Sequence, residues 1–117
     1  MPYIDGFVVA VPKANIERYK EFATFAGSVW KEHGARKYVE CLADDVPYGE
    51  LTSFPRAVMA KEDEVVVFSW VEYGSRKERD DIVAKVMSDS RLQGEEWKTL
   101  FDGRRMIYGG FQTIIEL

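Results

Sequence analysis

The sequence predicts an α+β fold in which one antiparallel sheet carries two helices on the same face. Four segments rich in β-branched and aromatic residues are typical of strands. Two segments with apolar residues at spacings of three and four are typical of helices. Their order along the chain is strand, helix, strand, strand, helix, strand, which is the ferredoxin-like βαββαβ arrangement. With 117 residues, of which 46% are hydrophobic and 31% charged, residues 1–117 fit a single globular domain.

The first half of the chain predicts a strand, a helix and a second strand. The segment Tyr3–Val11 is rich in β-branched residues and stops before a proline, as strands often do. Asn15 is placed to cap the helix that follows, and Gly34 stands where a glycine commonly ends one. The stripe of this helix consists of Ile16, Tyr19, Ala23, Ala26, Trp30 and His33, widened by Phe22, Phe25 and Val29. The second strand is predicted over residues 38–43.

Residues 44–49 are polar and rich in turn-forming residues. Two readings of residues 50–60 remain open: a short helical turn capped by Ser53, or an irregular strand. Residues 65–73 predict the third strand. Ser75 and Glu78 have the spacing of a capping box and predict a helix to about Met87. Its inward-facing residues are predicted to be Ile82, Val83, Val86 and Met87.

The last part of the chain predicts a less regular connection and a final strand. Residues 89–105 show no continuous pattern, apart from a possible short helix around 95–101. The final strand is predicted over residues 106–116. Its Gly109-Gly110 pair indicates a bulge or a close approach of two backbones.

Both faces of the predicted sheet are apolar, although two helices can cover only one of them. In the third strand Val65, Val67 and Val71 oppose Val66, Phe68 and Trp70, and the first and fourth strands behave similarly. An exposed apolar face of this size exceeds what monomers usually tolerate. A homodimer that packs open face against open face is the simplest way to cover it. Alternatively, residues 44–60 and 89–105 could fold back over this face.

Four blocks of the sequence resemble a known family. The segments YIDGFVVAVP, VECLADDVP, EVVVFSWVEY and FDGRRMIYGGF, in this order from Tyr3 to about Phe111, resemble the YbaA-like family of small bacterial proteins, a family of unknown function. That family is similar in fold to the dimeric α/β-barrel superfamily. The superfamily includes cofactor-independent monooxygenases, heme-degrading monooxygenases, isomerases and stress-response proteins. The resemblance therefore implies a dimeric α/β barrel, and it implies no particular catalytic residues.

Charge and missing motifs exclude several functions. The formal net charge of −4 gives no basic surface for general nucleic-acid binding or for an anionic membrane. No signal peptide or membrane-spanning run is recognisable, and the single cysteine can form no internal disulfide, so we expect a cytoplasmic protein. Phosphate-binding, dinucleotide-binding, nucleophile-elbow and zinc motifs are missing. We therefore expect no cofactor and no metal.

Three polar residues are the candidate catalytic groups: His33, Asp44 and Tyr108. His33 is the only histidine and could act as a general base if it reaches a cavity between helices and sheet. It could equally be a helix-terminal residue favoured by the helix dipole. Asp44 and Asp45 follow a strand, where paired carboxylates divide acid and base roles or simply form a turn.

The remaining candidates are ligand-contacting or structural. Trp30, Trp70, Tyr108 and Phe111 would line a pocket for a flat hydrophobic ligand, or else form the core. Arg104 is a candidate ligand-binding residue, and together with Arg105 it is a candidate partner for Asp5, a carboxylate that would need pairing inside an apolar strand. Cys41 is predicted to be a small buried hydrophobic residue, or else a nucleophile if His33 lies within reach to act as its base.

Two functional hypotheses follow. The first is a small cofactor-independent enzyme, monooxygenase-like or isomerase-like, acting on a small hydrophobic or aromatic molecule. The second is a non-catalytic homodimer that binds such a molecule or takes part in a stress response. The sequence leaves open whether the protein is an enzyme.

Overall fold

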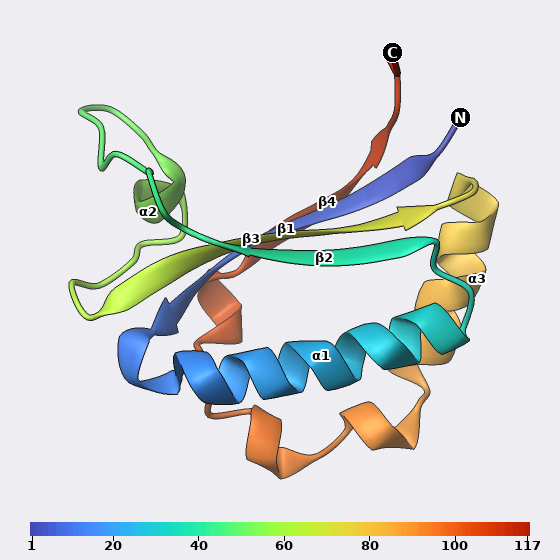
Figure 1. The fold of residues 1–117 in the computed structure, drawn as a ribbon, viewed down its shortest axis with the longest axis horizontal. Coiled ribbons are helices and arrows are strands. Elements are labelled where there is room, and N and C mark those ends of the chain that lie inside the picture. Colours follow the sequence, from blue (N-terminus) through green and yellow to red (C-terminus); the bar gives the residue numbers. More distant parts are fainter.

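The sheet has four antiparallel strands in the order β2-β3-β1-β4, in a computed structural model that describes residues 1–117. The strands are β1 (Tyr3–Pro12), β2 (Lys37–Leu42), β3 (Glu64–Tyr73) and β4 (Ile107–Gln112). Figure 1 shows α1 (Ile16–Glu32) and α3 (Arg76–Met87) on one side of the sheet and the short α2 (Phe54–Ala57) on the other. The predicted ferredoxin-like α+β fold is confirmed, with an open sheet in the single chain.

The two sides of the sheet bury different sets of residues. We call the side packed against α1 and α3 the helix face; it carries Val9, Val67 and Val71. We call the other side the open face; it carries Val8, Val66 and Phe68. Helix α1 buries Tyr19, Ala23, Ala26 and Val29 against the helix face, which matches the predicted stripe.

Helix α1 ends as predicted but begins differently. Gly34 has a φ of +117°, a left-handed conformation that favours glycine. Its N–H donates to the carbonyl of Lys31, and the N–H of Ala35 donates to the carbonyl of Trp30, which closes the helix as a Schellman motif. Asn15 precedes the helix without capping it. Its side-chain amide instead donates to the carbonyl of Leu100, 3.0 Å away, and so anchors the segment that follows α3.

Helix α3 is capped as the sequence predicts. The hydroxyl of Ser75 accepts a hydrogen bond from the backbone N–H of Glu78 at 3.1 Å. Ile82 and Val86 are buried, and Val83 packs against the same cluster. Met87 is 59% exposed, so its predicted inward orientation is wrong. Met87 is the last residue of the helix.

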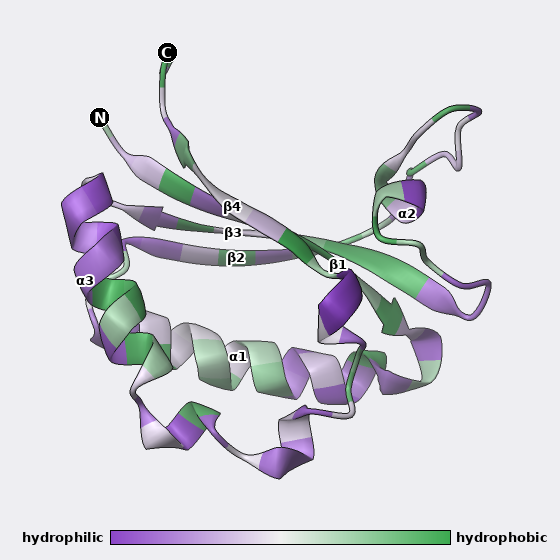
Figure 2. Cartoon of the chain, turned by 180° about the vertical axis from the view of Figure 1, so that it is seen from behind, coloured by the Kyte–Doolittle hydropathy of each residue, from purple (hydrophilic) through white to green (hydrophobic).

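Residues 43–60, which we call the strap, cover one end of the open face. Ser53 caps α2 by accepting from the N–H of Arg56 at 3.1 Å, so the helical reading of this segment is confirmed. Val58 is only 1% exposed and packs with Val8, Ala10 and Val66. In Figure 2 the hydrophobic stretches of β1 and β3 lie beside the strap at this end of the sheet.

The segment between α3 and β4 packs on the opposite side from the strap. It runs alongside α1 in three short 3-10 turns, Ser90–Leu92, Glu95–Trp97 and Gly103–Arg105 (Figure 1). Leu100 is fully buried, and Phe101 packs against the cluster around Val9. This segment therefore does not cover the open face.

Strand β4 is shorter than the sequence predicts, because Gln112 pairs with Tyr3, the first residue of β1. Beyond Gln112 no strand partner remains. The predicted bulge is absent, because Gly109 and Gly110 pair in regular register with Gly6 and Asp5. What approaches Gly110 closely is side chains rather than a backbone: an added Cβ would meet the Tyr3 hydroxyl and would lie 2.8 Å from a guanidinium nitrogen of Arg79.

Candidate functional site

A cavity of about 150 Å³ lies between α1 and the helix face of the sheet. Ten of the twelve residues that line it are hydrophobic, and among them Phe7, Phe22, Trp30 and Phe101 supply aromatic walls. Its polar groups belong to Tyr19, Tyr38, Glu40 and Ser69. Protein interiors are otherwise packed as densely as organic crystals, so a void of this size is a distinct feature of the fold.

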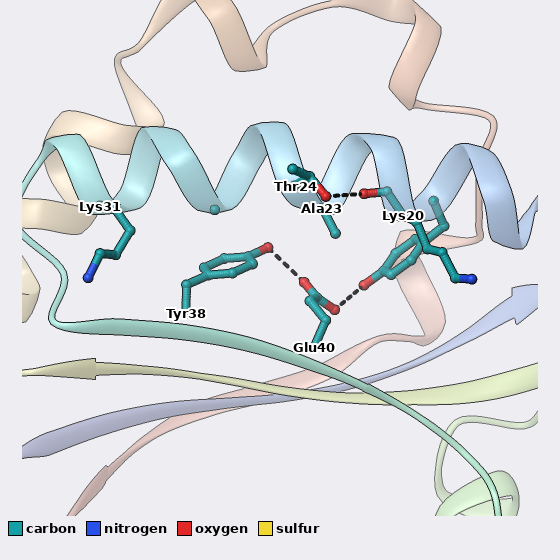
Figure 3. A pocket seen from close by; sticks show the side chains of 8 residues that line it. Lys20, Ala23, Thr24, Lys31, Tyr38 and Glu40 are labelled. Carbon is teal, nitrogen blue, oxygen red and sulfur yellow. Dashed lines mark hydrogen bonds between the residues drawn. The ribbon is translucent and has the colours of Figure 1, made fainter.

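The most polar part of this cavity is a hydrogen-bonded group formed by Tyr19, Glu40 and Tyr38. The hydroxyl of Tyr19 donates to Glu40 Oε1 at 2.7 Å, and the hydroxyl of Tyr38 donates to Glu40 Oε2 at 2.7 Å. Figure 3 shows Glu40 reaching from β2 toward α1 with Tyr38 beside it. Burial, followed by the charge of Glu40, raises the pKa of both phenols far above the usual value, so both keep their protons.

Strand register explains how these groups come together. Glu40 pairs with Ser69 across β2 and β3, and Ser69 pairs with Phe7 across β3 and β1. Their side chains therefore form one row on the helix face. Tyr38 lies two residues before Glu40 on the same face, since side chains alternate along a strand.

Gly27 of α1 allows the ring of Tyr38 to lie directly against the helix. A Cβ added at Gly27 would lie 2.6 Å from Cδ1 of Tyr38, a distance that real Cβ contacts do not show. Glycine lowers helix stability relative to alanine by about 1 kcal/mol, so its presence inside α1 is explained by this contact.

A surface groove of about 350 Å³ adjoins the cavity between α1 and β2. Tyr19, Tyr38 and Glu40 line both the groove and the cavity. Lys20 and Lys31 stand on the α1 side of the groove (Figure 3). The carboxylate of Glu40 thus lies at the boundary between solvent and the interior.

A second buried polar network lies beside the cavity. The hydroxyl of Tyr73 donates to Asp5 Oδ2 at 2.8 Å and accepts from Trp30 Nε1 at 3.0 Å. Arg79 of α3 forms the ion pair with Asp5, at 2.9 Å. The predicted pairing of Asp5 with Arg104 or Arg105 is therefore wrong, because α3 brings Arg79 over the start of β1 while Arg105 binds Glu64 and Asp102.

The three candidate catalytic residues lie apart from this cavity. His33 follows α1, and its Nε2 lies 2.9 Å from Asp89 Oδ2. Asp44 is exposed at the start of the strap. Tyr108 is 72% exposed on β4 and stacks on Phe7, with 6.3 Å between ring centroids. The structure does not bring these three together around one void, and their catalytic role stays a prediction.

Of the four candidate ligand-binding residues, only Trp30 lines the cavity. Trp70 and Phe111 lie on the open face, where Phe111 is 62% exposed. Arg104 is bound to Asp102, and its side chain is 91% exposed. Cys41, predicted to be buried, is exposed, because β2 is an edge strand whose open face the strap covers only in part.

Sequence reasoning missed Glu40 and the role of its two tyrosines. Glu40 is a carboxylate within a predicted strand, as Asp5 is, and a carboxylate that becomes buried needs polar partners. This feature of the sequence could have indicated that Glu40 has hydrogen-bond partners. The spacing of Tyr19 places it in the apolar stripe of α1 and does not indicate that its hydroxyl binds Glu40. No group of three or more His, Cys, Asp and Glu side chains is arranged to hold a metal ion.

The fold and the cavity define a small ferredoxin-like α+β protein with an interior site between its first helix and its sheet. A family model described as a protein of unknown function (DUF1428) matches residues 2–103, and the chain belongs to this family. The uncharacterized protein YbaA of Escherichia coli strain K12 is 52% identical over 116 residues, covering 99% of each chain, and YbaA of Shigella flexneri matches equally. The predicted family resemblance is confirmed.

Among solved structures, a crystal structure of a dimeric ferredoxin-like protein from an uncultured marine organism matches along the whole length of both chains. Its TM-score is 0.64 and its sequence identity is 14%, so the likeness extends to the fold alone. None of the helices combines the length and the apolar character that crossing a membrane requires.

Proposed function

We propose that this protein binds a single-ring, largely apolar molecule in the cavity between α1 and the sheet. The observation that carries the proposal is a cavity of about 150 Å³, lined mainly by hydrophobic residues, that also contains a carboxylate. An apolar cavity of about 150 Å³ is enough to take up benzene in other proteins. A few well-placed polar groups within an apolar pocket are the usual pattern of a small-molecule site.

An acid–base reaction on the bound molecule is the second candidate function. Of the two reaction types considered above, monooxygenase-like and isomerase-like, the half-buried carboxylate of Glu40 favours proton transfer of the isomerase type over oxygenation. Glu40 is the group in the cavity that could accept a proton, and it lies between Tyr19 and Tyr38. Binding without catalysis by a homodimer remains the simpler function.

The dimer is also part of the proposal. Phe68 is 42% exposed and Phe111 62% exposed on the open face, and the strap covers only one end of this face. A second copy packed on the remaining area would bury these rings. The marine protein of related fold is dimeric, which supports the existence of a dimer here.

Calorimetric titration with toluene and phenol tests the binding proposal. We expect at least one of them to bind with a stoichiometry of one per chain. The variant Ala26→Leu fills the cavity from α1 and should abolish binding, since Ala26 is 2% exposed and lines the void. The control Ala84→Leu adds the same side chain at an exposed position of α3 and should bind normally.

Two results would contradict the proposal. One is that neither compound binds to the wild-type protein at millimolar concentration. The other is that Ala26→Leu, folded by circular dichroism, binds as well as Ala84→Leu.

A further inference from the structure

The direction of the hydrogen bonds around Glu40 determines what a ligand in the cavity would meet. Tyr19 and Tyr38 both use their hydroxyl protons on the carboxylate, at 2.7 Å each. A phenol has one proton to donate, so neither tyrosine has a donor left for a ligand. Each phenol oxygen retains lone pairs, and the carboxylate has about four acceptor sites, of which the two tyrosines use two. The group therefore presents acceptors to the cavity.

The negative charge of Glu40 has no cation paired with it. None of the ion pairs of the structure includes Glu40, and the ammonium group of Lys31 donates to the carbonyl of Arg36 at 2.7 Å. Lys20 lies 3.3 Å from Glu17 on the surface of α1. A second negative charge entering the cavity would face this half-buried carboxylate, and like charges placed side by side repel each other.

The other groups that line the cavity do little to offset the repulsion that a second negative charge would meet. Ser69, buried at 7% exposure, pairs with Glu40 across the two strands and adds one hydroxyl group. The remaining walls are aromatic and aliphatic, apart from the groups already described. Such a site accommodates a neutral ring that carries an O–H or N–H donor.

We infer that the Tyr19–Glu40–Tyr38 group makes the cavity selective for neutral aromatic molecules that donate a hydrogen bond, and makes it reject aromatic carboxylates. The inference rests on the proposed function, because it concerns the same cavity. It goes beyond the proposed function because it names the chemical class of the ligand and identifies Glu40 as the residue that distinguishes neutral from negatively charged ligands.

Comparing three ring compounds of similar size at pH 7 tests the inference. Phenol and toluene are neutral and differ in one donor, whereas benzoate carries a negative charge. We expect phenol to bind at least about 10-fold more tightly than toluene, because only phenol can donate a hydrogen bond to the charged carboxylate. We expect benzoate to bind at least about 100-fold more weakly than phenol, because of the like-charge repulsion.

Two variants test whether the Tyr19–Glu40–Tyr38 group causes this selectivity. Glu40→Gln removes the charge with little change in size, so the preference for phenol over benzoate should fall to about 10-fold or less. Tyr38→Phe frees an acceptor site on Glu40, so the preference for phenol over toluene should rise. Glu72→Gln is the matched control: Glu72 lies on β3 with its side chain on the opposite face, so this change should leave both preferences unaltered.

The outcomes separate the two proposals. If none of the three compounds binds, the proposed function fails and the inference fails with it. If they bind in the cavity, as judged by loss of binding in Ala26→Leu, but without preference for phenol, only the inference fails. An unchanged ratio of phenol to benzoate binding in folded Glu40→Gln also overturns the inference.

Discussion

Single residues determine how closely α1 approaches the sheet. Gly27 lets the Tyr38 ring lie against the helix, and this position brings the Tyr38 hydroxyl within 2.7 Å of Glu40. A larger residue at position 27 would push the ring or the helix away. The geometry of the polar group in the cavity thus depends on the absence of one methyl group.

We expect Gly27→Ala to destabilise the protein by up to about 2 kcal/mol. Overpacking costs about 1–3 kcal/mol, and the better helix propensity of alanine returns about 1 kcal/mol of it. Urea unfolding followed by circular dichroism measures the difference. The matched control is Gly103→Ala, where an added Cβ meets no atom within 4 Å and the change should stay within about 0.5 kcal/mol of zero. A gain in stability at position 27 would refute the proposed role of this glycine.

At the level of elements, features that depend on neighbouring residues could be predicted from the sequence. Contacts between residues far apart in the chain could not. The run of β-branched and aromatic residues in β3, the stripe of α1 and the caps at Ser53 and Ser75 depend on neighbouring residues, so the sequence indicates them directly. Asp5 and Arg79 are 74 positions apart, and their contact depends on where α3 crosses the sheet. Glu40 meets Tyr19 only after β2 and α1 have packed together, which no local pattern specifies.

One arginine adds polar contacts between the strap and the sheet. Arg105 binds both oxygens of Glu64, at 2.8 and 2.7 Å, and its Nη1 also donates to the carbonyl of Met59 at 2.9 Å. Met59 has a φ of +52°, which is unfavourable for a residue with a side chain. The arginine therefore helps to hold the strap in a conformation that its own backbone disfavours.

We expect the strap to loosen in acid before the rest of the sheet. The hydrogen bond from Arg105 lowers the pKa of Glu64, and hydrogen bonds from Arg104 lower the pKa of Asp102 to about 2. A lowered pKa in the folded state means that the ionised carboxylate stabilises the fold. This contribution is complete above the unfolded-state pKa, about 4.5 for glutamate, and is lost as the pH falls through the folded value.

Hydrogen exchange at pH 5, 3.5 and 2.5, corrected for the intrinsic rates, measures this effect. The amides of Ala57, Met59 and Ala60 should lose protection at a higher pH than those of β3. Arg105→Gln should show the loosened strap already at pH 5, whereas Arg104→Gln, at a 91% exposed side chain, should resemble the wild type at that pH. Equal protection in Arg105→Gln and wild type would refute the role of the arginine.

On the scale of the whole molecule, the open face is the feature that the single chain leaves unexplained. The sequence predicted that both faces are apolar, and the structure covers the open face only where the strap crosses it. Ile107 is 45% exposed and Phe111 62% exposed on the part that stays uncovered. The proposed homodimer accounts for this composition better than a solvated sheet does, since monomers seldom expose so large an apolar patch.

We expect sedimentation equilibrium to show a dimer at micromolar concentration. The double variant Phe68→Lys with Phe111→Lys places two charges on the open face and should give a folded monomer. Met87→Lys is the control: Met87 is 59% exposed at the end of α3, away from this face, so the variant should remain a dimer. A wild-type protein that is monomeric under these conditions would rule the dimer out.

The position of Trp30 gives the molecule a built-in optical probe. Its ring lines the cavity, lies 5.8 Å from the ring centre of Tyr38, and donates its N–H to Tyr73. Trp70 lies on the open face. In a variant with Trp70 and Trp97 replaced by phenylalanine, the emission of Trp30 reports on occupancy of the cavity. In a variant with Trp30 and Trp97 replaced instead, the emission of Trp70 reports on the association of two copies. Fluorescence of one small chain can thus follow its two proposed binding surfaces separately, without any attached dye.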